Sequence, residues 1–280
     1  MAHSATAKAA VLGDPVDHSL SPVLHSAGYS ALGLAGWRYE AIRCPEGKLA
    51  DIVRSAGEDF RGFSVTMPGK PEALAFADEV TERARLVDSA NTLVRTADGW
   101  LADCTDIDGA YAALSAYSEL PPRPAIVLLG AGGTAKPFIA AIARIPGASI
   151  VIATRRPSAG GALECAARFG VEATDVRLAD PELPNLISSA DLVVSTIPEA
   201  GARELTELVR PAARLVDALY NPWPTPLGAA VRAGGGEVIG GDTMLLGQAL
   251  GQFELFTGEP APAAEMARAL REALATRSGR

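Results

Sequence analysis

The stretch Ala125-Ile-Val-Leu-Leu-Gly-Ala-Gly-Gly-Thr-Ala135 decides the fold class of this sequence. An apolar run leads into G-A-G-G-T-A, which matches the pattern G-x-G-x-x-G/A at a strand-to-helix turn. Gly130 permits the tight turn, Gly132 lets the backbone approach a pyrophosphate, and the small Ala135 lets the helix pack closely on the strand. An ordinary glycine turn is the alternative, but the strong apolar run before it and a second strand after it favour a nucleotide. The assigned cofactor-binding residues are Gly130, Ala131, Gly132, Gly133, Thr134 and Ala135.

The chain after residue 125 alternates short β-rich runs with longer helical stretches, which is typical of βαβ units around a parallel sheet. The predicted strands are 126–129, 150–153, 192–196, 215–218 and 237–239, and the helices between them include 135–144, 162–169 and 226–233. This pattern predicts a doubly wound, Rossmann-type nucleotide-binding domain.

The residues before this region form a second predicted α/β unit. Its strands are expected at 9–12, 37–42, 62–66 and 90–95, with helices at 24–32 and 49–56. The proline-rich stretch 120–124 is a natural joint between domains. Helical stretches at 242–256 and 263–274 carry no strand, so we expect them to pack on the first domain. The predicted organisation is an N-terminal α/β domain of residues 1–106 plus 243–280 and a Rossmann domain of residues 107–242.

Composition narrows the class of protein. The 280 residues are 48% hydrophobic, and 25 basic against 33 acidic residues give a net charge of −8. We therefore expect a globular chain whose partner is a small molecule, and neither nucleic acid nor a membrane. The chain shows neither a long apolar N-terminal segment nor a spanning stretch. We expect a cytoplasmic location, since Cys44, Cys104 and Cys165 form no C-x-x-C pattern. No metal is expected, because the histidines, His3, His18 and His25, form no ligand set.

The residues after the second Rossmann strand indicate which nucleotide binds. NAD-binding domains place an acidic residue there to bind the ribose 2′-hydroxyl, whereas this chain continues with Thr154, Arg155 and Arg156. Two guanidinium groups suit a 2′-phosphate, which they bind through charge-assisted hydrogen bonds. Although two solvated loop arginines are the alternative, the pair favours NADP.

Several polar residues of the first domain are candidates for a substrate site. Ser19 and Ser21 lie in a loop between a strand and a helix, where hydroxyls either bind a carboxylate or cap the helix. Thr66 ends a predicted strand, and Lys70 follows the turn after it. The other candidates are the Asn91-Thr92 pair and the run Asp103-Cys104-Thr105-Asp106, and no single one of these features is specific alone.

Together and in order, these motifs resemble the shikimate dehydrogenase family over nearly the whole chain. They are the S-x-S loop at Ser19, the V-T-x-P-x-K turn ending at Lys70, the N-T pair, the T-D of Thr105-Asp106 and the G-A-G-G turn. The last region is also similar, with Tyr220-Asn221-Pro222, Thr225-Pro226, Gly241 and Met244-Leu-Leu-Gly-Gln248. Two residues depart from the family pattern, since Ser64 and Cys104 stand where the family usually has asparagine. A thiol replaces neither donor of an amide.

The resemblance implies an enzyme, an NADP-dependent shikimate dehydrogenase that reversibly reduces 3-dehydroshikimate to shikimate in aromatic amino-acid (chorismate) biosynthesis. It makes the first domain the substrate-binding domain, with Lys70 and Asp106 as the catalytic residues. The implied substrate-binding residues are Ser19 and Ser21 for the carboxylate, Thr66, Asn91 and Asp106 for the ring hydroxyls, and Tyr220 and Gln248 to complete the pocket. Ala218 and Gly241 are implied to lie near the nicotinamide, and Thr154, Arg155 and Arg156 to complete the NADP site.

Two other functions stay open at this point. A quinate/shikimate dehydrogenase of broader specificity is the nearest, and in the resembling family it is often NAD-linked, against which Arg155 and Arg156 argue. The other is a catalytically silent NADP-binding regulatory protein, against which the presence of both Lys70 and Asp106 argues. The sequence leaves open whether the chain forms a homodimer.

Overall fold

The computed structural model describes residues 7–117, 119–157 and 161–278, and the chain divides into two compact units. The first comprises residues 1–105 and 248–280, and the second comprises residues 106–247. Both units are mixed α/β structures, so the predicted two-domain α/β fold class is confirmed.

The first unit is built on a six-stranded sheet of order β2-β1-β3-β5-β6-β4. Strands β1, β2 and β3 run parallel, whereas β5 is antiparallel to both β3 and β6. The strands are β1 (Ala7–Gly13), β2 (Trp37–Arg43), β3 (Phe60–Val65), β4 (Glu79–Val80), β5 (Thr92–Arg95) and β6 (Trp100–Asp103). The central β1 is a nearly continuous apolar run because both of its faces are buried.

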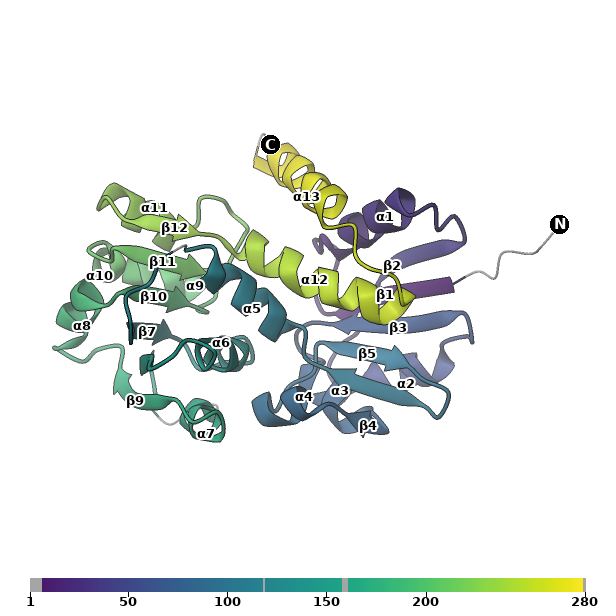
Figure 1. The fold of residues 1–280 in the computed structure, drawn as a ribbon, viewed down its shortest axis with the longest axis horizontal. Helices are drawn as coiled ribbons and strands as arrows, with labels where there is room; N and C mark the ends of the chain where they lie inside the picture. Colours follow the sequence, from purple (N-terminus) through teal and green to yellow (C-terminus); the bar gives the residue numbers. More distant parts are fainter. Residues whose placement is uncertain (1–6, 118, 158–160, 279–280) are drawn as a thin grey trace. The chain divides into compact units, whose positions relative to one another are not determined.

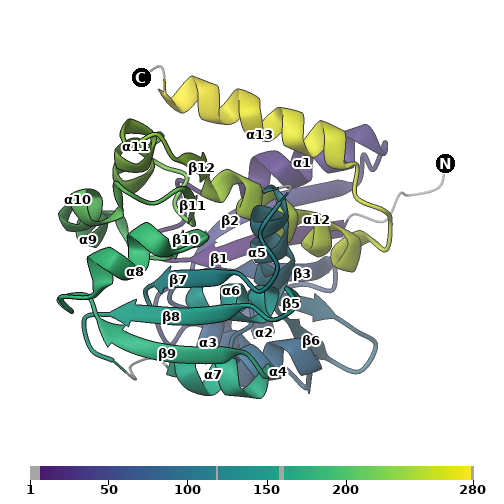
Figure 2. The same ribbon diagram turned by 60° about the vertical axis from the view of Figure 1, so that its left-hand side comes forward.

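Helices cover both faces of this sheet (Figure 1). Leu49, Val53 and Ala73, from α2 and α3, pack with β1, β3 and β5 in one core cluster. On the other side, the His25 ring of α1 stacks on Tyr39 of β2 and on Phe253 of α12, and α13 lies along α1 in both ribbon views (Figure 1, Figure 2). The helices are α1 (Ser21–Ala31), α2 (Leu49–Ser55), α3 (Lys70–Phe76), α4 (Glu82–Val87), α13 (Ala263–Ser278) and the second half of α12 (Gly241–Thr257). The expected return of the C-terminal helices to the first unit is therefore confirmed.

The second unit contains a six-stranded, fully parallel sheet of order β12-β11-β10-β7-β8-β9, seen in Figure 2. Its strands are β7 (Ala125–Leu129), β8 (Ser149–Thr154), β9 (Glu172–Arg177), β10 (Leu192–Ser195), β11 (Arg214–Asp217) and β12 (Glu237–Ile239). The chain order reverses between β7 and β10, which is the switch point where doubly wound sheets bind their ligands.

The helices of the second unit lie before, between and after these parallel strands in the chain. They are α5 (Asp106–Ser115), α6 (Ala135–Ile142), α7 (Ala162–Arg168), α8 (Leu183–Ser189), α9 (Glu199–Ala202), α10 (Thr206–Val209), α11 (Pro226–Ala233) and the first half of α12. In the part of the chain that the structure describes, no helix has the length and apolar character to cross a membrane.

Sequence patterns missed several short elements. Strand β9 carries polar residues and lies at an edge of its sheet, so it lacks the apolar run that marked its neighbours. Strand β4 has only two residues, and α3 and α4 have seven and six, too few for a helical period to be read. The predicted strand 62–66 ends one residue earlier, so Thr66 lies in the turn that follows β3.

Candidate active site

The topology of the first sheet gathers the candidate substrate residues at one edge. Leu12 of β1 pairs with Val65 of β3, and Ser64 pairs with Thr92 of β5, which in turn pairs with Asp103 of β6. The ends of β1, β3 and β6 and the start of β5 therefore meet at this edge. The loop with Ser19 and Ser21, the turn with Thr66 and Lys70, Asn91, and the run from Cys104 all leave the sheet there.

The loop after β1 places the two serines differently. Ser19 is half-buried, and its Oγ accepts a hydrogen bond from the backbone N–H of Ser21, the first residue of α1, at 3.2 Å. Ser21 is buried, and its hydroxyl partly offsets the rise that burial causes in the pKa of Tyr39. The N-cap of α1 is Leu20, which makes no side-chain cap. Neither serine is thus the N-cap, although Ser19 satisfies one helix-terminal N–H.

A tight turn connects β3 to the helix that begins with Lys70. The Thr66 carbonyl accepts from the Gly69 N–H at 2.9 Å, and the Met67 carbonyl accepts from the Asp14 N–H at 3.0 Å. A Cβ on Gly13 would lie 2.3 Å from Cγ2 of Thr66, so only glycine allows β1 to end this close to the turn. The turn holds Thr66 and the half-buried Lys70 at the sheet edge.

The helix of Lys70 is also held from its other side. The carboxylate of Glu72 accepts the Gly47 N–H at 2.7 Å and the Leu49 N–H at 3.2 Å, at the start of α2. An acidic group that satisfies helix-terminal N–H donors stabilises both the helix end and the connection. These contacts fix the backbone that carries Lys70.

Asn91 is buried in a hydrogen-bond network, and a backbone N–H donor determines the orientation of its side-chain amide. Its Oδ1 accepts the Thr105 N–H at 2.8 Å and the Thr92 hydroxyl at 2.9 Å. Because a backbone N–H only donates, Nδ2 points the other way, to Thr105 Oγ1 at 2.9 Å and Gln248 Oε1 at 3.4 Å. The structure therefore brings together two candidates, Asn91 and Gln248.

The run from Asp103 to Asp106 is anchored by an ion pair. Arg83 Nε donates to Asp103 Oδ1 at 2.7 Å, and the Thr81 hydroxyl donates to the same atom at 2.7 Å. Burial alone would raise the pKa of Asp103, but the bonds from Arg83 and Thr81 outweigh it and hold this pKa below its usual value. Cys104 is fully buried and Asp106, which begins α5, is 6% exposed.

The glycine-rich turn of the second unit has the geometry that a dinucleotide requires. Gly130 has φ +105°, a conformation that L side chains rarely adopt, and its N–H donates to the Ala153 carbonyl at 2.9 Å. No atom lies within 4 Å of the position of a Cβ on Gly132 or Gly133, so these backbones are open to a ligand. Helix α6 then begins at Ala135 without a side-chain cap from Thr134. The residues present fit a bound pyrophosphate.

The end of β8 fits the rest of such a cofactor. Thr154 is 7% exposed, and its buried hydroxyl has no hydrogen-bond partner among the described residues. A buried hydroxyl of this kind is costly unless a ligand or water satisfies it. Arg155 and Arg156 follow and are both exposed.

The loop after β11 carries two further candidates, Ala218 and Tyr220, and a third, Gly241, begins α12. A Cβ on Gly241 would lie 2.0 Å from the Ala218 carbonyl oxygen, so the two backbones are in close contact. The buried Asp217 supports this loop, since Oδ1 accepts the Leu219 N–H at 3.2 Å and Oδ2 accepts the Thr225 hydroxyl at 2.6 Å. Burial raises the pKa of Asp217, and these two hydrogen bonds oppose that effect.

Sequence reasoning missed two side chains at the sheet edge, namely Tyr39 and Gln252. Gln252 Nε2 donates to the Asn91 carbonyl at 3.0 Å, and Tyr39 Oη lies 2.5 Å from Ser64 Oγ. One signal was available, because Gln252 follows Gln248 by four residues and shares its helix face. No comparable signal marked Tyr39, which lies in an edge strand far from any motif.

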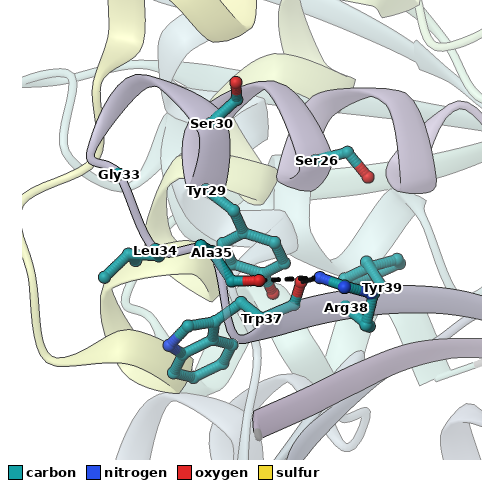
Figure 3. Close-up of a pocket in the computed structure, with 9 residues that line it drawn as sticks. All are labelled: Ser26, Tyr29, Ser30, Gly33, Leu34, Ala35, Trp37, Arg38 and Tyr39. Carbon is teal, nitrogen blue, oxygen red and sulfur yellow. Dashed lines mark hydrogen bonds between the residues drawn. The ribbon is translucent and has the colours of Figure 1, made fainter. Parts of the chain in front are cut away.

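A cavity of about 420 Å³ lies elsewhere on the first unit, between α1 and the start of β2 (Figure 3). Ser26, Tyr29 and Trp37 are among its lining residues, and Arg38 donates to the carbonyls of Ala35 and Trp37 beside it. No predicted site residue lines it. Over the residues that the structure describes, no group of three His, Cys, Asp or Glu side chains is arranged to hold a metal ion; His3 lies outside them.

Comparisons with known proteins identify the family of this two-unit α/β chain. Residues 11–93 match the family model described as shikimate dehydrogenase substrate binding domain, and residues 243–271 match shikimate 5'-dehydrogenase C-terminal domain. A relative from Desulfitobacterium hafniense, named shikimate dehydrogenase (NADP(+)), is 34% identical over 271 residues, which are 95% of this chain and 98% of that protein. The chain belongs to the shikimate dehydrogenase family.

Two solved structures agree with this assignment. Mycobacterium tuberculosis shikimate dehydrogenase is 45% identical with a TM-score of 0.89, over 95% of this chain and 99% of that one. Shikimate 5-dehydrogenase from Thermus thermophilus, solved in complex with NADP(H) and shikimate, is 31% identical with a TM-score of 0.80, over 96% of this chain and 100% of that one. The family resemblance predicted from the motifs is confirmed.

Proposed function

We propose that this chain is an NADP-dependent shikimate dehydrogenase, which reversibly reduces 3-dehydroshikimate to shikimate. One observation carries the proposal. The motif residues of the first unit, far apart in the sequence, leave a single edge of its sheet, where Asn91 Nδ2 lies 3.4 Å from Gln248 Oε1. The relative named shikimate dehydrogenase (NADP(+)) and the Thermus thermophilus structure in complex with NADP(H) and shikimate support the same reaction and the same cofactor.

The substrate is a ring with one carboxylate and several hydroxyl groups, and the proposed roles match these groups. Ser19 and Ser21 bind the carboxylate through their hydroxyls, and Thr66, Asn91 and Asp106 bind the ring hydroxyls. Tyr220 and Gln248 complete the substrate set. A site of hydroxyl and amide groups discriminates strongly, since an analogue without a hydroxyl leaves buried polar groups unpaired.

Lys70 and Asp106 are proposed as the catalytic residues. NADPH, when bound, supplies the hydride that reaches the ring carbonyl. Lys70, as a cation, stabilises the negative charge that develops on the carbonyl oxygen and donates the proton that this oxygen takes up. Asp106 accepts a hydrogen bond from the reacting hydroxyl and orients it toward Lys70. In the oxidation direction the same lysine, once neutral, accepts the proton.

The second unit is proposed to hold the cofactor. The open backbone at Gly132 and Gly133 and the uncapped start of α6 suit the pyrophosphate. The Thr154 hydroxyl, which has no hydrogen-bond partner among the described residues, and the exposed Arg155 and Arg156 suit the adenosine 2′-phosphate. Ala218, in close backbone contact with Gly241, is proposed to lie beside the nicotinamide.

We also propose a place for the enzyme in the cell. Reduction of 3-dehydroshikimate belongs to aromatic amino-acid biosynthesis through chorismate, and a cytoplasmic location is supported by the free thiols of Cys44, Cys104 and Cys165. The proposed partners are small molecules. A homodimer stays a proposal, which light scattering coupled to size-exclusion chromatography tests directly.

The proposed function is tested by following absorbance at 340 nm while shikimate or quinate is offered with NADP⁺ or NAD⁺. We expect the highest kcat/KM for shikimate with NADP⁺. Comparable efficiency with quinate and NAD⁺ would instead identify a broad quinate/shikimate dehydrogenase. Tight NADP⁺ binding without turnover of either substrate would identify a silent regulatory protein.

A further inference from the structure

A buried chain of hydrogen bonds joins α12 to the candidate substrate site of the first unit. Gln252 is 1% exposed, and its Nε2 donates to the Asn91 carbonyl at 3.0 Å and to Thr92 Oγ1 at 3.1 Å. Its Oε1 accepts the Ser64 hydroxyl at 2.6 Å, and Ser64 Oγ lies 2.5 Å from Tyr39 Oη. Four elements, β2, β3, α12 and the start of β5, are thereby connected through one side-chain amide.

The hydrogen bonds of this network allow only one arrangement of donors and acceptors. A backbone carbonyl only accepts, so the Gln252 amide must present Nε2 to Asn91 and Oε1 to Ser64. Ser64 donates its single hydroxyl proton to Gln252 Oε1. Tyr39 is therefore the donor in the 2.5 Å contact with Ser64. Thr92 agrees with this arrangement, since its own proton goes to Asn91 Oδ1 and its oxygen accepts from Gln252.

This chain of hydrogen bonds ends on Asn91, one of the proposed substrate-binding residues. Asn91 immediately precedes β5, and its carbonyl accepts the Val65 N–H at 2.7 Å, whereas Thr105 and Thr92 orient its side-chain amide. Gln252 shares the Asn91 carbonyl with Val65 and, through Thr92, supports the acceptor side of the Asn91 amide. The bond from Nδ2 to Gln248 Oε1, at 3.4 Å, is longer than the 2.9 Å bond to Thr105, so Gln248 is the acceptor that a substrate hydroxyl replaces at least cost.

We propose that Gln252 is a positioning residue for shikimate oxidation, one that aims the Asn91 Nδ2–H at a substrate hydroxyl without touching the substrate itself. This inference rests on the proposed function. It predicts that losing the Gln252 amide weakens shikimate binding through Asn91 and leaves NADP⁺ binding unchanged. A merely structural role would instead lower stability and leave both Michaelis constants alone.

The first test compares Gln252→Leu with the wild-type chain and with Thr257→Val. Thr257 is a matched control, because it lies on the same helix and donates a hydrogen bond to the Phe253 carbonyl at 2.7 Å. In Gln252→Leu we expect the KM for shikimate to rise by about tenfold, the effect of one misplaced hydrogen bond, and the KM for NADP⁺ to change less than about twofold. Thr257→Val should lower the melting temperature with neither constant changed.

A double-mutant cycle shows whether Gln252 acts through Asn91. If it does, Gln252→Leu added to Asn91→Ala should raise the KM for shikimate by less than about twofold further, because the positioned group is already gone. Effects that multiply independently would overturn the assignment. So would an unchanged KM for shikimate in Gln252→Leu.

Gln252→Glu gives a second readout that also serves if Gln252→Leu does not fold. A protonated glutamic acid donates to the Asn91 carbonyl as the amide does, whereas an ionised one has no proton to donate. The ratio of its KM for shikimate to that of the wild type should therefore rise with pH, by about tenfold overall. A ratio that is flat with pH contradicts the proposal. If the wild type itself does not oxidise shikimate with NADP⁺, the proposed function fails first and this assignment fails with it.

Discussion

The buried histidine of α1 should make the free energy of unfolding depend on pH, and the structure gives the size of this effect. His25 is 0% exposed, and its ring stacks on Tyr39 with centroids 4.2 Å apart. Burial lowers the pKa of His25 from 6.5 to about 3, and the neighbouring Gln252 offsets only part of that effect. Between these two values the unfolded chain binds a proton that the folded chain does not. The free energy of unfolding therefore falls as the pH falls through this window.

Linkage gives the magnitude of this effect. With a pKa of 6.5 in the unfolded chain and about 3 in the folded one, His25 costs about 2 kcal/mol of stability at pH 5 and only about 0.2 kcal/mol at pH 7. His25→Phe keeps an aromatic ring on Tyr39 and removes the titration. We expect the variant to gain about 2 kcal/mol relative to the wild type when the pH is lowered from 7 to 5.

Urea unfolding at the two pH values and constant ionic strength measures this difference. The signal should come from the first unit, so a Trp223→Phe background leaves Trp37 and Trp100 as the fluorescent residues. Comparison at each pH cancels the titration of all other groups. A wild-type-to-variant difference that is the same at pH 7 and pH 5 would refute the reasoning, because it would mean that His25 has equal proton affinity in both states.

Three further predictions follow from the proposed roles. Lys70→Ala should lower kcat for shikimate oxidation by about 10²- to 10⁴-fold with smaller changes in either KM, and steady-state kinetics at 340 nm will show whether it does. Arg155→Ala should raise the KM for NADP⁺ by about 10- to 100-fold and leave NAD⁺ turnover unchanged, because only NADP⁺ carries the 2′-phosphate. Equal losses with both cofactors would show that Arg155 does not act on the 2′-phosphate. Ser19→Ala should raise the KM for shikimate by about tenfold if Ser19 binds the carboxylate. A lower melting temperature with unchanged KM would mean that Ser19 acts only through its hydrogen bond to the start of α1.

Much of the fold was predictable because its central strands are buried on both faces. β1, β7 and β10 are nearly continuous apolar runs, and such runs are visible without any structural knowledge. The edge strand β9 was not predictable in this way, since it alternates polar with partly buried residues. The glycine turn was also predictable, because the conformation of Gly130 demands glycine at a fixed offset from the strand.

The candidate site was only half predictable, for a different physical reason. Ser19, Lys70 and Asn91 belong to short motifs, in which neighbours along the chain define the pattern. Gln252 and Tyr39 act through hydrogen bonds to residues far away in the sequence. No local pattern of residue types reports such a partner, so side chains that support a site from a distance become visible only once the strands are paired.

The mixed sheet of the first unit explains how these separate motifs serve one site. In a fully parallel sheet only strand ends, and the loops after them, reach the edge where the ligand binds. Here β5 runs antiparallel between β3 and β6, so the start of β5 reaches the same edge as the ends of its neighbours. Asn91, just before β5, is thereby set beside Val65 and Thr105, and Gln252 connects it to Ser64 of β3. A one-residue slip of β5 would move Asn91 off this register and point Thr92 to the other face. The pairing of Ser64 with Thr92, and of Thr92 with Asp103, is thus a requirement of the site as much as of the fold.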